Sequence, residues 1–300
     1  MRFSVTATTA VIACSCMAAA YVGVLYTLPY TIRRLPRDHP THILAQFLLI
    51  CIFCALCPFV LAVFYDHHEA SMSFAQWLGI RWEGLVESFI IPLFVTAVLF
   101  TGFTRTACGS PLKTSALYYS ITHDRLPSLR TYVLGPLTEE FVFRSCTIPL
   151  LVCADFTVKQ IVLGSPLMFG AAHLHHFIEY VQHGRSPKDA ALTVGFQFIY
   201  TFLFGAYATF IFLRTGHFAS IFLVHVFCNI MGFPDLSFFN PESSLHPYRL
   251  VLLGAYFLGI YGFSLLLMPL TEPAIYASEM WNVTVSTTEH DLVFGYSETL

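Results

Sequence analysis

Charge is scarce in this chain of 300 residues. Asp, Glu, Lys and Arg make up 11% of it, whereas soluble domains carry about 25%. Only three residues are lysine, and the net charge is −3, so there is no basic excess of the kind that binds nucleic acid. Hydrophobic residues make up 56%. This composition predicts an all-α fold, a polytopic bundle of transmembrane helices embedded in a lipid bilayer.

Two common hydrolase signatures are also missing. The chain has no Gly-x-Ser-x-Gly nucleophile motif and no His-Glu-x-x-His zinc motif. Its nine cysteines are odd in number. Cys51, Cys54 and Cys57 follow each other at helical spacing within an apolar run, which favours packing over metal or redox chemistry.

Eight apolar segments predict about eight spans, joined in a single transmembrane domain over residues 1–270. The first segment is interpreted as a retained helix, with a cleaved signal peptide as the alternative, because its apolar run is long enough to cross a bilayer. Residues 271–300 are predicted to form an acidic, irregular tail. The segments cover approximately residues 8–28, 43–65, 84–104, 131–153, 161–178, 190–214, 217–233 and 248–270.

Basic residues predict the orientation of these spans. The connections after the odd-numbered segments hold ten Lys and Arg residues, among them Arg33, Arg130 and Arg185, whereas the other side holds four. The positive-inside rule therefore places the odd connections in the cytosol and both termini outside or in a lumen. Asn282, in the sequence Asn-Val-Thr, would then be a luminal glycosylation sequon.

The segment 131–153 contains Glu139, Glu140 and Arg144 inside an otherwise apolar run. Each charge costs about 2.5–3.5 kcal/mol at the centre of a membrane, so such residues indicate a functional site. Glu140 and Arg144 are i, i+4 neighbours in the favourable order for an ion pair. Glu139 points about 100° away around the helix. The alternative is an ion-pair network that only holds helices together.

Two further segments carry polar side chains at a similar predicted depth. Phe169 and His173 share one helix face, and His225 and Asn229 share another. A carboxylate beside an imidazole can deprotonate water, and His with Asn can stabilise an oxyanion, a combination suited to amide hydrolysis. Two alternatives remain: a metal-dependent variant, because Glu and His also bind zinc, and a non-enzymatic membrane scaffold or transporter with a helix-locking polar network.

The motifs Glu-Glu-x-x-x-Arg at 139–144, Phe-x-x-x-His at 169–173 and His-x-x-x-Asn at 225–229 resemble those of the ABI/CPBP intramembrane proteases. Within that family the chain is similar to the eukaryotic type II CAAX prenyl endopeptidases, the Ras-converting enzymes. The motif core covers residues 131–233. The resemblance implies Glu139 as the base that activates water and His173 as the residue that positions it. It also implies His225 and Asn229 as the oxyanion site.

The same resemblance implies an endopeptidase that removes the C-terminal tripeptide from prenylated CAAX proteins, such as Ras-like GTPases. It implies no cofactor, with a divalent metal as the alternative, and a multi-pass location in the endoplasmic reticulum membrane with the active site toward the cytosol. Glu140 and Arg144 would be a supporting ion pair, with Phe169 beside them. His175 and His176 are assigned to packing or to hydrogen bonds between helices.

Overall fold

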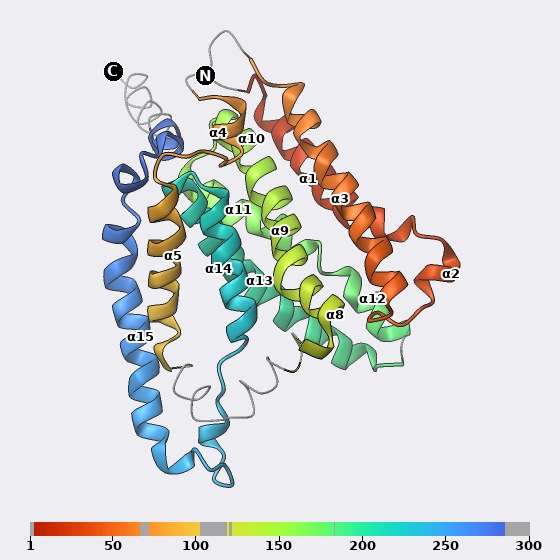
Figure 1. The fold of residues 1–300 in the computed structure, drawn as a ribbon, viewed down its shortest axis with the longest axis vertical. Coiled ribbons are helices and arrows are strands. Elements are labelled where there is room, and N and C mark those ends of the chain that lie inside the picture. The colour runs from red at the N-terminus through yellow and green to blue at the C-terminus, as the bar shows by residue number, and fades with distance from the viewer. Residues whose placement is uncertain (1–2, 67–71, 103–118, 120–121, 183, 286–300) are drawn as a thin grey trace, which may run out of the picture.

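The computed structural model describes residues 3–66, 72–102, 119, 122–182 and 184–285 (Figure 1). Within these ranges the regular elements are helices, and the one β-bridge joins Phe3 to Tyr65. The α-helices are α1 (Ala7–Tyr26), α2 (Tyr30–Arg33), α3 (Pro40–Ala62), α4 (Phe74–Trp77), α5 (Leu85–Leu99), α8 (Arg125–Leu129), α9 (Gly135–Glu140), α10 (Ile148–Cys153), α11 (Val158–Ala171), α12 (His175–Gln182), α13 (Pro187–Thr215), α14 (Phe218–Met231) and α15 (Arg249–Leu270). Two π-helical segments, η1 (Arg130–Leu134) and η2 (Phe141–Cys146), and three 3₁₀ turns, η3 (Ser237–Phe239), η4 (His246–Tyr248) and η5 (Pro273–Tyr276), complete the described elements.

The helices confirm the predicted polytopic all-α fold. Five helical stretches are long and apolar enough to cross a membrane: α1, α3, α11 with α12, α13, and η4 with α15. Two shorter apolar helices, α5 and α14, lie beside them. Each of the eight predicted apolar segments coincides with a helix or a continuous helical run. The fourth segment differs from the others, because it is divided into short α and π pieces.

This divided helix, from α8 to α10, lies inside the bundle (Figure 1). Every residue from Val142 to Cys153 is buried. Helices α1 and α3 pack on one side of it, and α11, α13 and α14 pack on others. Glu140 and Arg144 are buried within protein and Glu139 faces a cavity, which are the surroundings where ionisable groups within a membrane are tolerated.

Two π-helical segments flank α9, the short helix that carries both glutamates. In η1 the amide of Gly135 donates to the carbonyl of Arg130, five residues back. A π-helical turn adds a residue to the helix and rotates the next turns about the axis, and such turns are frequent at functional sites. The spacing from Glu140 to Arg144 still allows the predicted ion pair.

Local sequence signals set the ends of the helices around the site. Thr157 and Gln160 form a reciprocal capping box at the start of α11, which satisfies backbone amides that have no partner in the first turn. Ser186 caps α13, and Gly216 ends it in the left-handed conformation at φ 63°, which glycine adopts without strain. Helices α11 and α13 are thereby aligned as a closely packed pair.

The segment after α15 differs from the predicted irregular tail. Within its described part, residues 273–276 form η5 and residues 279–285 are helical. Arg214 fixes the start of this segment, with Nε 2.9 Å from the Thr271 carbonyl and its guanidinium 4.6 Å from the Trp281 ring. Tyr276 and Met280 are buried, so apolar contacts outweigh the acidic composition there. Residues 286–300 lie outside the described residues.

Candidate active site

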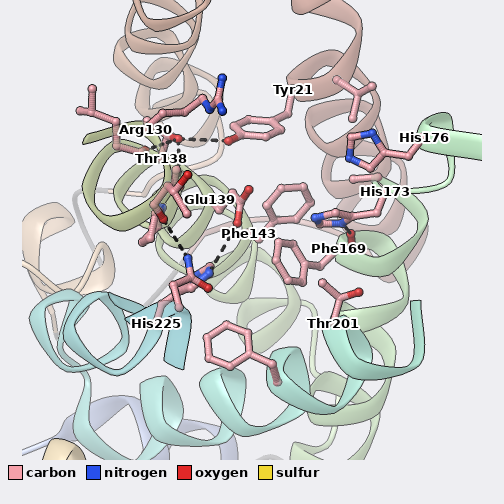
Figure 2. A pocket seen from close by; sticks show the side chains of 18 of the residues that line it. Tyr21, Arg130, Thr138, Glu139, Phe143, Phe169, His173, His176, Thr201 and His225 are labelled. Atoms are coloured by element: carbon pink, nitrogen blue, oxygen red, sulfur yellow. Dashed lines mark hydrogen bonds and ion pairs between the residues drawn. The ribbon is translucent and has the colours of Figure 1, made fainter. Parts of the chain in front are cut away.

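One large cavity of about 1430 Å³ contains the predicted site. It exceeds the usual 300–1,000 Å³ of ligand pockets. Its walls come from α1, α3, α5, α9, α11 to α15 and the connection before α3. The predicted residues Glu139, His173, His225, Asn229 and Phe169 all line it. The side chains that we expected to meet from three helical segments therefore share one cavity (Figure 2).

Glu140 and Arg144 lie behind the cavity wall and form the predicted ion pair. Arg144 Nη1 donates to Glu140 Oε1 at 3.0 Å, and both side chains are almost fully buried. The same Glu140 oxygen also accepts a hydrogen bond of 2.7 Å from Nδ1 of His225. Glu140 thus links the divided central helix to α14, a contact that the sequence motifs do not reveal.

Glu139 and Glu140 differ in their surroundings, although they are adjacent. Glu139 is 25% exposed and reaches the cavity, whereas Glu140 is completely buried. Glu139 Oε2 lies 3.8 Å from Nε2 of His225. The imidazole of His225 therefore stands between the two carboxylates, with one ring nitrogen toward each. Glu140 therefore takes part in buried polar contacts, whereas Glu139 can contact a molecule in the cavity.

Aromatic rings enclose the buried guanidinium. Arg144 lies 4.4 Å from the centroid of Phe169 and 5.8 Å from that of Phe204. Such cation–π contacts contribute about 0.5–2 kcal/mol, more when desolvated. Phe204 also contacts the His225 ring at 4.5 Å. Phe169 thus contacts Arg144 and also forms part of the cavity wall.

His173 lies across the cavity from Glu139, at the junction of α11 and α12 (Figure 2). Its Nδ1 is 2.9 Å from the carbonyl oxygen of Phe169. Because a carbonyl only accepts hydrogen bonds, Nδ1 must carry the proton. In the neutral ring Nε2 is then an acceptor, suited to a hydrogen bond from water. The backbone of α11 therefore fixes the tautomer of His173.

Asn229 lies one helical turn beyond His225 on α14 and also lines the cavity. Its Nδ2 donates to the carbonyl of Thr131 at 3.0 Å. That carbonyl belongs to η1, so Asn229 ties α14 to the π-helical segment before the glutamates. An amide nitrogen carries two N–H donors, and the second is available toward the cavity.

Tyr21 is a cavity residue that sequence reasoning missed. Its hydroxyl lies 3.0 Å from that of Thr138, the residue before Glu139, and its ring contacts Phe143 at 5.4 Å (Figure 2). Thr138 in turn donates to the carbonyl of Leu134 at 2.8 Å. The only signal in the sequence was a tyrosine within the apolar first span. Tyr21 thus connects α1 to the helix that carries the glutamates.

Comparisons with known proteins give the relatives of this chain. The family model described as "Type II CAAX prenyl endopeptidase Rce1-like" matches residues 122–231. A protein from Arabidopsis thaliana named CAAX prenyl protease 2 is 36% identical over 91% of this chain and 93% of its own. A human protein of the same name is 36% identical over 89% of this chain and 83% of its own. A fission-yeast protein named probable CAAX prenyl protease 2 is 41% identical over 42% of this chain and 47% of its own. No solved structure matches the chain significantly.

Proposed function

Since this chain belongs to the type II CAAX prenyl endopeptidase family, we propose that Glu139 is the base with which it hydrolyses prenylated CAAX proteins. The chain is a CAAX prenyl endopeptidase of the membrane. The observation that supports the glutamate mechanism is the difference between the surroundings of the two acids. Glu140 is buried against Arg144 and His225, whereas Glu139 faces the cavity that His173 also lines.

In this mechanism a water molecule lies between Glu139 and His173. Glu139 accepts one of its protons, and Nε2 of His173 accepts a hydrogen bond from the other O–H group, which orients the oxygen. The hydroxide attacks the carbonyl carbon of the peptide bond after the prenylated cysteine. The C–N bond then breaks, and Glu139 returns the proton to the leaving amine, as general acid–base catalysis requires. The products are a new carboxylate and a free tripeptide.

The oxyanion of the tetrahedral intermediate would be stabilised by His225 and Asn229. Nδ1 of His225 donates to Glu140 at 2.7 Å, and Nε2 would donate to the oxyanion when it also carries a proton. Donors fixed in advance around a developing negative charge are often the largest contribution to catalysis.

The cavity also suits a substrate that is part lipid and part peptide. Aromatic residues of α13, among them Tyr200 and Phe204, line it together with the arginines Arg33, Arg130 and Arg185. We propose that the prenyl group enters from the bilayer between helices, and that the peptide reaches the site from the arginine-bearing side. The positive-inside rule supports the cytosol for that side. An endoplasmic reticulum location and Ras-like GTPases as substrates belong to this proposal.

The test uses tag-free protein purified in detergent and a farnesylated CAAX peptide. Mass spectrometry should detect the released tripeptide, Glu139→Ala should abolish its release, and Glu242→Gln, an exposed acid on a distant loop, should not. Activity should also survive a chelator. Turnover by a folded Glu139→Ala variant would overturn the assignment of the base. Loss of activity with chelator and recovery with one metal would favour the metal-dependent alternative.

A further inference from the structure

A second group of potential ligands lies in the same cavity but away from Glu139. His175, His176 and Glu179 are on α12, and one donor atom from each lies within 4.8 Å of the others. Among the described residues this is the only such group of three His, Cys, Asp or Glu side chains. All three line the cavity. The sequence by itself favours packing or hydrogen bonds between helices for both histidines, and the structure adds their proximity to Glu179.

The distances within this group fit a small transition-metal ion. His176 Nδ1 donates to Glu179 Oε2 at 2.9 Å, a hydrogen bond that a bound ion would replace, and His175 Nε2 is 3.9 Å from Glu179 Oε1. Tetrahedral zinc with ligands at about 2.0–2.1 Å requires donor atoms about 3.3 Å apart. The observed separations lie on either side of that value, so small rotations of the side chains would bring the donors onto one ion.

The orientation of His175 favours metal binding over a simple ion pair. Its Nδ1 is 2.6 Å from the Ala172 carbonyl, and must therefore donate to it. In the neutral ring Nε2 then presents a lone pair on the side of the Glu179 carboxylate, 3.9 Å away. A divalent cation can accept that lone pair and bind the carboxylate at the same time. A backbone carbonyl that fixes the other ring nitrogen is also the usual outer contact of a metal-bound histidine.

The group is separate from the hydrolytic one. The His176 ring is 6.1 Å from that of His173, the residue nearest to it among those assigned to hydrolysis (Figure 2). Arg185, the nearest cation along the sequence, lies over the Tyr180 ring at 4.6 Å, and Arg37 is a positive charge near Glu179. We propose that His175, His176 and Glu179 form a binding site for a divalent cation of the zinc class on the cavity wall. Two imidazoles and one carboxylate hold the ion, and water completes its coordination.

Zinc binding to the purified full-length protein tests this inference directly. Tag-free protein is treated with chelator, dialysed and titrated with ZnCl₂, and bound zinc is measured by mass spectrometry and calorimetry. We expect one zinc ion per chain. His175→Ala, His176→Ala and Glu179→Gln should each weaken binding at least about tenfold, because even loss of an outer contact costs 10–100-fold in affinity. Glu179→Gln preserves side-chain size, and thermal unfolding verifies that each variant is folded.

Two controls separate this site from others. His246→Ala and Glu242→Gln, on the connection between α14 and α15, should leave zinc affinity unchanged. Glu139→Gln should also leave it unchanged, so the result does not depend on the proposed hydrolytic mechanism. The proposal is overturned if the wild-type chain binds no zinc, if Glu179→Gln binds as tightly as wild type, or if binding is lost in Glu139→Gln instead.

Discussion

Adjacent glutamates at positions 139 and 140 have opposite surroundings. Glu140 is completely buried and shares one oxygen between Arg144 and His225. Its other oxygen, Oε2, finds no hydrogen-bond partner among the described residues, and neither does Nη2 of Arg144. Neutralising either partner would therefore leave the other charge uncompensated in the interior. The structural role of Glu140 and the reactive role proposed for Glu139 can be separated by measuring stability and activity together.

We expect Glu140→Gln to lower the stability of the protein markedly. Breaking a buried ion pair by removing one partner costs about 3–5 kcal/mol, because the remaining charge is unpaired. Glu139→Gln, at a partly exposed position, should change stability little. Thermal unfolding in detergent compares the two variants. Equal melting temperatures for Glu140→Gln and wild type would contradict the role given to the pair.

The sequence allowed much of this site to be predicted, because charged residues in apolar helices are conspicuous. The i, i+4 ion pair and the set that faces one cavity follow from helical periodicity. The hydrogen bond from His225 to Glu140 joins residues 85 positions apart. Helical periodicity cannot predict a contact between residues so far apart in the sequence. Tyr21 was missed for the same reason, because its contact with Thr138 depends on which helices are neighbours.

At the scale of helices, the close approach of α11 and α13 positions the central arginine. Gly205 of α13 faces α11, and a Cβ built there would lie 3.0 Å from Cβ of Pro166 and 3.1 Å from Nη2 of Arg144. Gly195 lies on the same helix, but a Cβ at that position would meet nothing within 4 Å. The two glycines form a matched pair for testing the contact.

We predict opposite effects for alanine at these positions. Gly205→Ala should destabilise the protein, because overpacking costs about 1–3 kcal/mol, and should reduce turnover by displacing Arg144. Gly195→Ala should raise stability by about 0.5–1 kcal/mol through its helix propensity. Thermal unfolding and peptide release measure both effects. A stable and fully active Gly205→Ala variant would show that this packing does not position the site.

The connection from α13 to α14 contains a buried histidine outside the spans. Burial, together with nearby Arg81, lowers the pKa of His217 to about 4, although the hydrogen bond from Nε2 to the Glu83 carbonyl opposes the shift. Its ordinary value is about 6.5. Between these values the unfolded chain binds a proton that the folded chain does not, so stability falls as the pH drops from about 6.5 toward 4.

Replacing this histidine should therefore make stability less sensitive to acid. His217→Gln keeps an N–H donor for Glu83 but does not titrate. We expect its melting temperature to fall less than that of wild type between pH 7 and pH 5, as measured in parallel unfolding scans. An identical pH dependence in the two proteins would contradict the buried, neutral state of His217.

The positions of the helices could be predicted from the sequence, but their division into α- and π-helical segments could not. Every predicted apolar segment contains a helix among its described residues, because runs of about 20 apolar residues have few other folds in a membrane. The π-helical segments at 130–134 and 141–146 depend on how the central helix fits between its neighbours. The turns at 273–276 form because Tyr276 is buried, a tertiary effect that acidic composition conceals.

On the scale of the whole molecule, the bundle is polarised. The start of α1 and the end of α15 lie at one end of the molecule (Figure 1). The connection between α14 and α15 lies at the opposite end, and α2 lies at the side of the molecule, beyond the end of α1 (Figure 1). Arg33, Arg34 and Arg37 line the cavity together with Arg130 and Arg185. This arrangement agrees with an even number of crossings, and the cytosolic side for the arginines stays a prediction of the positive-inside rule.

The orientation predicts which parts of the chain a protease can reach. In sealed microsomes, a tag fused to the C-terminus should be protected from added protease and digested only after detergent is added. A tag inserted after Asn240, on the connection between α14 and α15, should be digested without detergent. The reverse pattern would place the arginine-lined side of the cavity in the lumen and contradict the proposed topology.

Whether Glu139 is the base is decided most sharply by a single-turnover measurement on Glu139→Gln with a farnesylated CAAX peptide, with peptide binding measured on the same sample. If Glu139 is the base, the variant should fold and bind the peptide as the wild type does, while the rate of tripeptide release falls about 10²–10⁴-fold, the usual contribution of general acid–base catalysis. A folded Glu139→Gln variant that cleaves the peptide at the wild-type rate would contradict the glutamate mechanism.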